Sequence, residues 1–130
     1  MTLYHYTATE RVEQIIRDGQ LYPMRDFVSA ESLARQADWV RENFGLIWMT
    51  DLDRPAAMAL GLTNRIIRAD RTEARFRVVG EGAIPWTKHR RHANPTLVDA
   101  LESAPGAMPS HWYIATEPIA VVHDPIGVAV

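Results

Sequence analysis

Residues 3–23 read LYHYTATERVEQIIRDGQLYP, and this stretch carries the clearest local signals of secondary structure in the chain. Leu3 to Tyr6 is short, aromatic and apolar, which is typical of a β-strand. Thr7 and Glu10 have the spacing of a capping box, in which a hydroxyl and a carboxylate satisfy backbone N–H groups at the start of a helix. Gly19 is placed to end that helix in the left-handed conformation. The chain is therefore predicted to open as strand, tight turn and helix.

Apolar periodicity predicts two helices in the first third of the chain. In the first helix, Val12, Ile15 and Ile16 fall on one face, which predicts that this face is buried. Ser29 can cap a second helix, whose apolar residues repeat at helical spacing until Gly45.

Later segments alternate between short strands and short helices. Residues 46–50 form an apolar run typical of a strand with both faces covered, and residues 74–79 alternate as in a half-buried strand near an edge. Two more strands are predicted at 111–116 and 119–122, and a last one at 126–130. A short helix is predicted up to Leu60, and Asn94-Pro95 opens another. This order predicts an α+β fold rather than a regular βαβ series.

The composition is that of one globular domain over residues 1–130. Hydrophobic residues make up 47% and charged residues 23%, which excludes wholesale disorder. The net charge of -2 provides no overall electrostatic attraction to nucleic acid or to a membrane. With 0 cysteines, a disulfide framework, a thiolate nucleophile and a cysteine zinc site are excluded. The N-terminus lacks the pattern of a signal peptide, and no apolar run approaches the ~18 residues of a membrane span, so we expect a cytoplasmic protein.

Two ring-bearing residues could contact a ligand. The imidazole of His5 sits at a strand end, where it could donate or accept a hydrogen bond; the alternative is a partly buried histidine satisfied by backbone. Trp48 could be a stacking face for a nucleobase or nicotinamide, or it could fill the core.

Basic and histidine residues cluster in residues 88–92, and five arginines precede them: Arg65, Arg68, Arg71, Arg75 and Arg77. Such a cluster could form a local groove for phosphates or a solvated loop balanced by nearby acids. His89 and His92 lie three residues apart, and His123 precedes Asp124. No third ligand stands at a suitable spacing, so no metal site is predicted.

His111 and Glu117 flank an aromatic strand, and either could act as a general base toward a substrate hydroxyl. The alternative is that Glu117 caps a turn and His111 is an exposed strand-start residue. The motifs of serine hydrolases, P-loop proteins and Rossmann proteins are absent from the sequence.

The order of three blocks resembles the ADP-ribosyltransferase-like superfamily, which includes bacterial toxin-type and PARP-like NAD-binding domains. The first block is Leu3-Tyr4-His5-Tyr6-Thr7, followed by a helix with Ile15-Ile16 and Gly19. The second is Gly45-Leu46-Ile47-Trp48-Met49-Thr50, and the third is His111-Trp112-Tyr113-Ile114. Members of this superfamily begin the third block with a catalytic Glu, and this chain has His111 there.

The resemblance implies a split β-sheet with short flanking helices and a cleft for NAD between two small sheets. NAD, as the substrate, would contact His5, Tyr6, Thr7 and Trp48, with His5 on the nicotinamide ribose and Trp48 against the nicotinamide ring. His111 and Glu117 would be the catalytic residues, and ADP-ribose would pass to an unidentified acceptor with release of nicotinamide.

A protein or nucleic-acid acceptor would be contacted through Lys88, Arg90 and Arg91. Because His111 replaces the expected acid, two alternatives stay open. One is a catalytically inactive NAD- or nucleotide-binding module of the same fold. The other is an RNA 2′-phosphotransferase-like enzyme, in which histidines and the basic cluster would handle RNA phosphate.

Overall fold

The computed structural model describes residues 1–55, 57–60 and 73–126. In these residues, seven strands form an antiparallel sheet in the order β2-β7-β4-β1-β3-β6-β5. The strands are β1 (Tyr4–Thr7), β2 (Gln20–Leu21), β3 (Ile47–Thr50), β4 (Ala74–Val78), β5 (Ile84–Pro85), β6 (Trp112–Ala115) and β7 (Ile119–His123). The α-helices are α1 (Val12–Asp18), α2 (Ala30–Ala34), α3 (Asp38–Phe44), α4 (Trp86–His89) and α5 (Pro95–Glu102). The prediction of an α+β fold is confirmed at this level.

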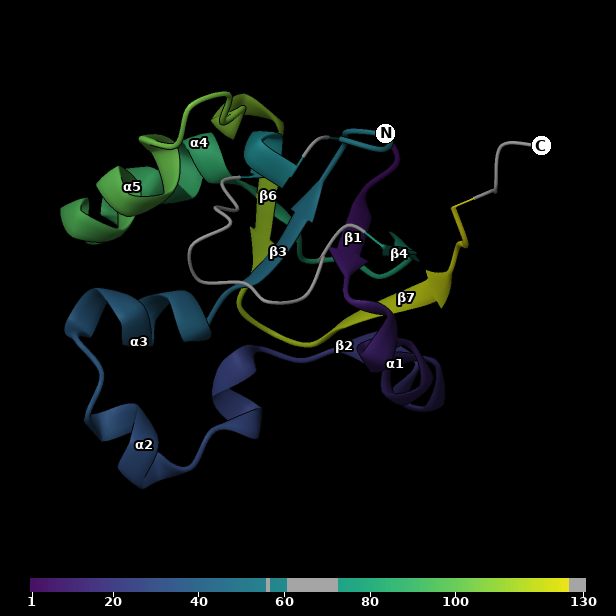
Figure 1. The fold of residues 1–130 in the computed structure, drawn as a ribbon, viewed down its shortest axis with the longest axis horizontal. Helices are drawn as coiled ribbons and strands as arrows, with labels where there is room; N and C mark the ends of the chain where they lie inside the picture. The colour runs from purple at the N-terminus through teal and green to yellow at the C-terminus, as the bar shows by residue number, and fades with distance from the viewer. Residues whose placement is uncertain (56, 61–72, 127–130) are drawn as a thin grey trace.

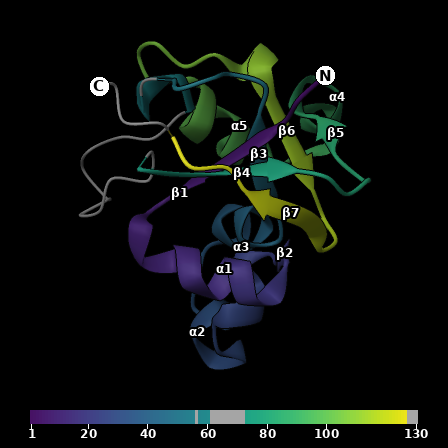
Figure 2. The same ribbon diagram turned by 90° about the vertical axis from the view of Figure 1, so that its right-hand side faces the viewer.

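The helices lie on opposite sides of the sheet and bury two apolar clusters. Figure 1 shows α1 beside β2 and β7, whereas α4 lies beside β6. Figure 2 shows α1 and α5 on opposite sides of the strands. The first cluster surrounds Phe76 and includes Ile15 of α1. The second surrounds Trp86, Trp112 and Leu97.

The sheet is nearly divided between β1 and β3. β1 pairs with β4 at four positions, and β3 pairs with β6 at four positions. Between β1 and β3, the pairing is limited to Tyr4 and Thr50. The two strands therefore meet at one end and diverge toward Thr7 and Ile47.

The opening segment differs from its prediction at two points. Thr7 is buried as the last residue of β1, opposite Ala74, and the turn at Thr9–Arg11 begins after Ala8 without a side-chain cap. The predicted capping box is therefore wrong, because strand pairing holds Thr7. Gly19 does end α1 in the left-handed conformation, at φ 70°. The buried face of α1 is narrower than predicted, because Ile16 is 53% exposed.

Other local predictions agree with the structure more closely. Ser29 caps α2 by accepting a hydrogen bond from the backbone N–H of Ser32, and Asn94 caps α5 in the same way from Thr96. The single helix expected before Gly45 is two helices, α2 and α3.

Strand β4 is correctly placed but lies inside the sheet, between β1 and β7, and the prediction of an edge position is wrong. Predicted strand 126–130 falls outside the described residues except for its first residue, which is not in a strand. None of the described helices is long and apolar enough to cross a bilayer.

Two buried tryptophans allow a matched test of the second cluster. Trp112 Nε1 donates to the Ala59 carbonyl oxygen at 2.8 Å, whereas Trp86 Nε1 is buried and has no hydrogen-bond partner among the residues that the structure describes. A lost hydrogen bond costs about 1 kcal/mol, and removing an unsatisfied buried donor relieves a cost of about 1–3 kcal/mol. We expect Trp112→Phe to lower the free energy of unfolding by about 1–2 kcal/mol more than Trp86→Phe, measured by urea denaturation. An equal or larger loss in Trp86→Phe contradicts this assignment.

Candidate functional site

A cleft opens where β1 and β3 diverge. It has a volume of about 530 Å³ and is lined by residues of both strands together with α1, β2 and the adjoining turns. His5, Tyr6 and Thr7 line it from β1, and Trp48 lines it from β3. The four residues predicted to contact NAD therefore border one cavity, although they come from strands more than 40 positions apart in the sequence.

His5 bridges the two diverging strands. Its Nδ1 lies 2.8 Å from the backbone carbonyl oxygen of Trp48. Because a carbonyl oxygen only accepts, Nδ1 carries the hydrogen of this bond. The bond therefore fixes the orientation of the imidazole at the cleft.

Trp48 lines the cleft and also belongs to the second cluster. Its indole Nε1 donates to Asn43 Oδ1 at 2.9 Å, and its ring centroid lies 5.0 Å from that of Trp86 and 5.9 Å from that of Trp112. His5 instead lies opposite Phe76 of the first cluster. The two side chains thus leave their strands toward different faces, and Trp48 has the core role that was one of its two interpretations. Its role in stacking on a ligand stays a prediction.

Tyr6 fixes the loop that follows β3. Its hydroxyl donates to the Leu52 carbonyl oxygen at 2.9 Å and accepts from the Arg54 backbone N–H at 2.9 Å. Arg54 has a positive φ of 53°, a conformation that non-glycine residues seldom adopt. The buried tyrosine, which lines the cleft, therefore holds a strained turn in the loop after β3.

The cleft also contains charged and aromatic residues outside the set predicted from sequence to form a site. Glu10, Arg11 and Asp18 supply its charged lining, and Arg11 is its one cation within the part of the chain that the structure describes. The Arg11 guanidinium lies 5.6 Å from the ring centroid of Phe27, which meets Tyr22 edge to face. The sequence could have indicated Arg11 and Asp18, because helical spacing places them on the same side as the buried Ile15.

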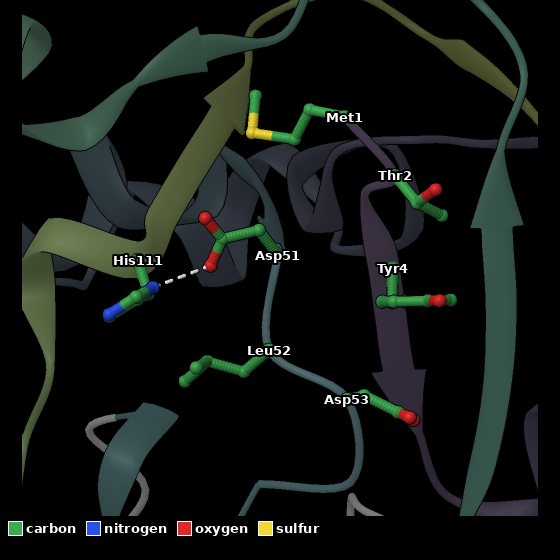
Figure 3. Close-up of a pocket in the computed structure, with 7 residues that line it drawn as sticks. All are labelled: Met1, Thr2, Tyr4, Asp51, Leu52, Asp53 and His111. Atoms are coloured by element: carbon green, nitrogen blue, oxygen red, sulfur yellow. Dashed lines mark hydrogen bonds and ion pairs between the residues drawn. The ribbon is translucent and has the colours of Figure 1, made fainter.

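His111 lies in a second, open pocket. This terminal pocket has a volume of about 430 Å³ and is lined by Met1, Thr2, Tyr4, Asp51, Leu52, Asp53 and His111 (Figure 3). His111 Nδ1 lies 2.7 Å from Asp51 Oδ1. Glu117 is exposed in the turn between β6 and β7 and lines neither the cleft nor the terminal pocket. The structure therefore separates the two predicted catalytic residues by the length of β6.

Arg75 is a buried cation behind the terminal pocket, only 9% exposed. Its guanidinium contacts Asp53 Oδ1 at 2.5 Å and Asp124 Oδ2 at 3.3 Å, and it lies over the Tyr4 ring. Burial lowers the pKa of Arg75, but the hydrogen bond with Tyr6 and the two carboxylates outweigh burial, so the pKa is raised. The guanidinium is a fixed positive charge that ties β4 to two loops. No signal in the sequence separates Arg75 from Arg77, because both alternate with apolar residues along the same strand.

The predicted acceptor-contacting residues lie away from both cavities. Lys88, Arg90 and Arg91 are exposed on α4 and the turn after it, and they line neither cavity. Arg90 pairs with Glu102 at 3.0 Å. Arg65, Arg68 and Arg71 fall outside the described residues. Among the residues that the structure describes, no group of three or more His, Asp or Glu side chains could hold a metal ion.

Comparisons with known proteins found no matching family model, no matching curated protein and no matching solved structure. The candidate site is therefore defined by its geometry.

The contacts of Arg75 generate a stability prediction with a control on the same strand. Lysine keeps the charge but lacks the planar fork that contacts Asp53 and Asp124 together. We expect Arg75→Lys to lower the free energy of unfolding by about 1.5–3 kcal/mol, the usual value of hydrogen bonds to charged groups. Arg77→Lys, at an exposed position of β4, should change it by less than about 0.5 kcal/mol. Urea denaturation measures both; similar losses in the two variants would refute the role given to Arg75.

Proposed function

We propose that this chain has the split β-sheet of ADP-ribosyltransferase-like proteins and binds NAD in the cleft, and that it transfers ADP-ribose to an acceptor with release of nicotinamide. The observation that carries this proposal is the divergence of β1 from β3 beyond the Tyr4–Thr50 pair, which opens a cavity bordered by His5, Tyr6, Thr7 and Trp48. These are the residues that the resemblance assigns to NAD.

The size and the lining of the cleft support a dinucleotide as ligand. A volume of about 530 Å³ lies within the ~300–1,000 Å³ range of small-molecule sites. The wall combines apolar and aromatic side chains with a few polar groups, as such sites do. Arg11 is positioned to neutralise part of the pyrophosphate charge, since arginine binds phosphate oxygens through its forked N–H groups.

In the proposed reaction, each wall of the cleft contacts a different part of NAD. His5, oriented by its bond to the Trp48 carbonyl oxygen, would contact the ribose of the nicotinamide half. The Trp48 and Trp112 side of the cleft would border the nicotinamide ring. Departure of nicotinamide leaves an oxocarbenium-like ribose C1′, which a carboxylate stabilises. Glu117 is the acid predicted from sequence, and Glu10 and Asp18 are carboxylates in the cleft lining itself.

One observation favours a second function, an NAD- or nucleotide-binding module without turnover. Glu117 lines neither cavity, and the family's acid position holds His111, which lines the terminal pocket rather than the cleft. The RNA 2′-phosphotransferase alternative has less support, because Lys88, Arg90 and Arg91 lie away from both cavities.

Isothermal calorimetry with NAD tests the assignment of the cleft. We expect His5→Ala to weaken NAD binding by about 1–2 kcal/mol, or roughly 5–30-fold, because a polar contact is lost. Arg11→Gln should also weaken it, whereas Arg17→Gln, on the exposed side of α1, should bind NAD as the wild type does. Melting temperatures of all variants control for folding. Wild-type affinity in folded His5→Ala and Arg11→Gln proteins would rule out this cleft as the NAD site.

Nicotinamide release separates the transferase from the binding module. Wild-type protein incubated with NAD labelled in its adenylate half should release free nicotinamide and pass the label to water or another acceptor. Binding without release would favour the module, and absence of binding would reject both functions.

A further inference from the structure

His111 and Asp51 form a bonded pair at the edge of the terminal pocket. The Asp51 carboxylate, which can only accept when ionised, lies 2.7 Å from Nδ1. Nδ1 therefore carries the hydrogen, which leaves the lone pair on Nε2 whenever the ring is neutral. The side chains are 37% and 24% exposed, so the imidazole is held by the aspartate yet reachable from solvent. Figure 3 shows Nδ1 turned toward Asp51 and the far edge of the ring turned away from it.

The backbone holds the same two residues in place. The His111 carbonyl oxygen accepts from Thr50 Oγ1 at 2.8 Å and from the Asp51 backbone N–H at 3.4 Å. The His111 N–H donates to the Met108 carbonyl oxygen at 3.0 Å. Because β3 and β6 pair up to Thr50 and Trp112, both partners extend directly from paired strand ends. The geometry is thus set before any ligand arrives, which is what general-base catalysis requires.

The charges of the terminal pocket fit an uncharged acceptor. Among the residues that the structure describes, its lining includes no lysine or arginine side chain, so no basic side chain is placed there to bind an anionic group. Its two carboxylates are already engaged, Asp51 by His111 and Asp53 by Arg75. A hydroxyl group or water is the nucleophile that such a site suits, because a neutral oxygen must lose a proton to become an effective nucleophile.

The terminal pocket adjoins the closed end of the cleft. Tyr4 lines both cavities, and Thr50, which binds the His111 carbonyl, lines the cleft. Trp112, the residue after His111, also lines the cleft. A ligand at the closed end of the cleft and a nucleophile in the terminal pocket would therefore meet beside this pair.

We propose that His111 is the general base that activates a neutral hydroxyl acceptor in the terminal pocket, with Asp51 as its positioning residue. This inference rests on the proposed function, because it requires NAD in the cleft. The acceptor oxygen forms a bond to ribose C1′ as the bond from C1′ to the nicotinamide nitrogen breaks. Nicotinamide leaves as a neutral molecule with the bonding electron pair. The acceptor proton passes to His111 Nε2, Asp51 stabilises the resulting imidazolium, and the proton then goes to solvent.

The test uses water as the acceptor and follows nicotinamide release from NAD. We expect His111→Ala to slow release by about 10²–10⁴-fold, the usual contribution of a general base. Its NAD affinity, measured by calorimetry, should stay within about twofold of wild type, because His111 lines the terminal pocket and not the cleft. Added imidazole should restore part of the rate, because an open pocket of about 430 Å³ has room for it.

Asp51→Asn should lower kcat and leave KM for NAD unchanged, because the amide does not fix the tautomer with the lone pair on Nε2. His123→Gln and Asp99→Asn are the matched controls; both residues are exposed, line neither cavity and should react at the wild-type rate. Nitrogen NMR of the wild-type protein tests the geometry without NAD or any variant. It should report His111 as the Nδ1–H tautomer when neutral.

The outcomes separate this inference from the proposed function. A His111→Ala protein that binds NAD and keeps the wild-type rate, or that imidazole does not rescue, overturns the inference and leaves NAD turnover in place. The Nε2–H tautomer in the wild-type protein overturns it as well. A wild-type protein that neither binds NAD nor releases nicotinamide rejects the proposed function, and the inference falls with it.

Discussion

The limited pairing between β1 and β3 is the constraint on which the rest of the candidate site depends. Antiparallel strands normally satisfy their backbone groups along their whole length, but these two pair only at Tyr4 and Thr50. Beyond that pair, each strand keeps a full partner on its other side, so the sheet opens without losing its integrity. His5 spans part of the opening through its bond to the Trp48 carbonyl oxygen. A cavity can therefore exist within the sheet and be lined by both of its halves.

The two cavities differ in the way that their polar groups are held. In the cleft, a backbone carbonyl orients His5, and charged residues of α1 and the turn before it border the space. In the terminal pocket, side chains hold one another: Asp51 contacts His111, and Asp53 contacts Arg75. The buried guanidinium of Arg75 has a fixed charge, and its carboxylate partners keep the loop after β3 close to β4. That loop also carries Asp51, so the ion pairs of Arg75 help to hold Asp51 in position beside His111.

Where sequence and structure differ, long-range pairing outweighs a local signal. Thr7 and Glu10 have the spacing of a capping box, yet Thr7 is buried opposite Ala74, and a residue in a strand ladder cannot also begin a helix. Alternation along β4 is typical of an edge strand, but Arg75 on its polar side is neutralised by acids from two distant loops. Alternation reports which residues share a face and carries no information on what covers that face. Trp48 has a related ambiguity, because a tryptophan in an apolar strand can fill a core and border a cavity together.

The elements whose causes are local could be predicted from the sequence. Gly19 ends α1, Ser29 caps α2 and Asn94 caps α5, since each depends on backbone groups only a few residues away. The sequence also indicated that the first strand, with His5, and the strand of Trp48 would border one site, although that indication came from a resemblance in the order of blocks. The strand order, the opening between β1 and β3, and the bond between Asp51 and His111, which are 60 positions apart, could not be predicted without the folded structure. Such contacts depend on how distant strands are registered against each other, and a local pattern of residue types does not encode that register.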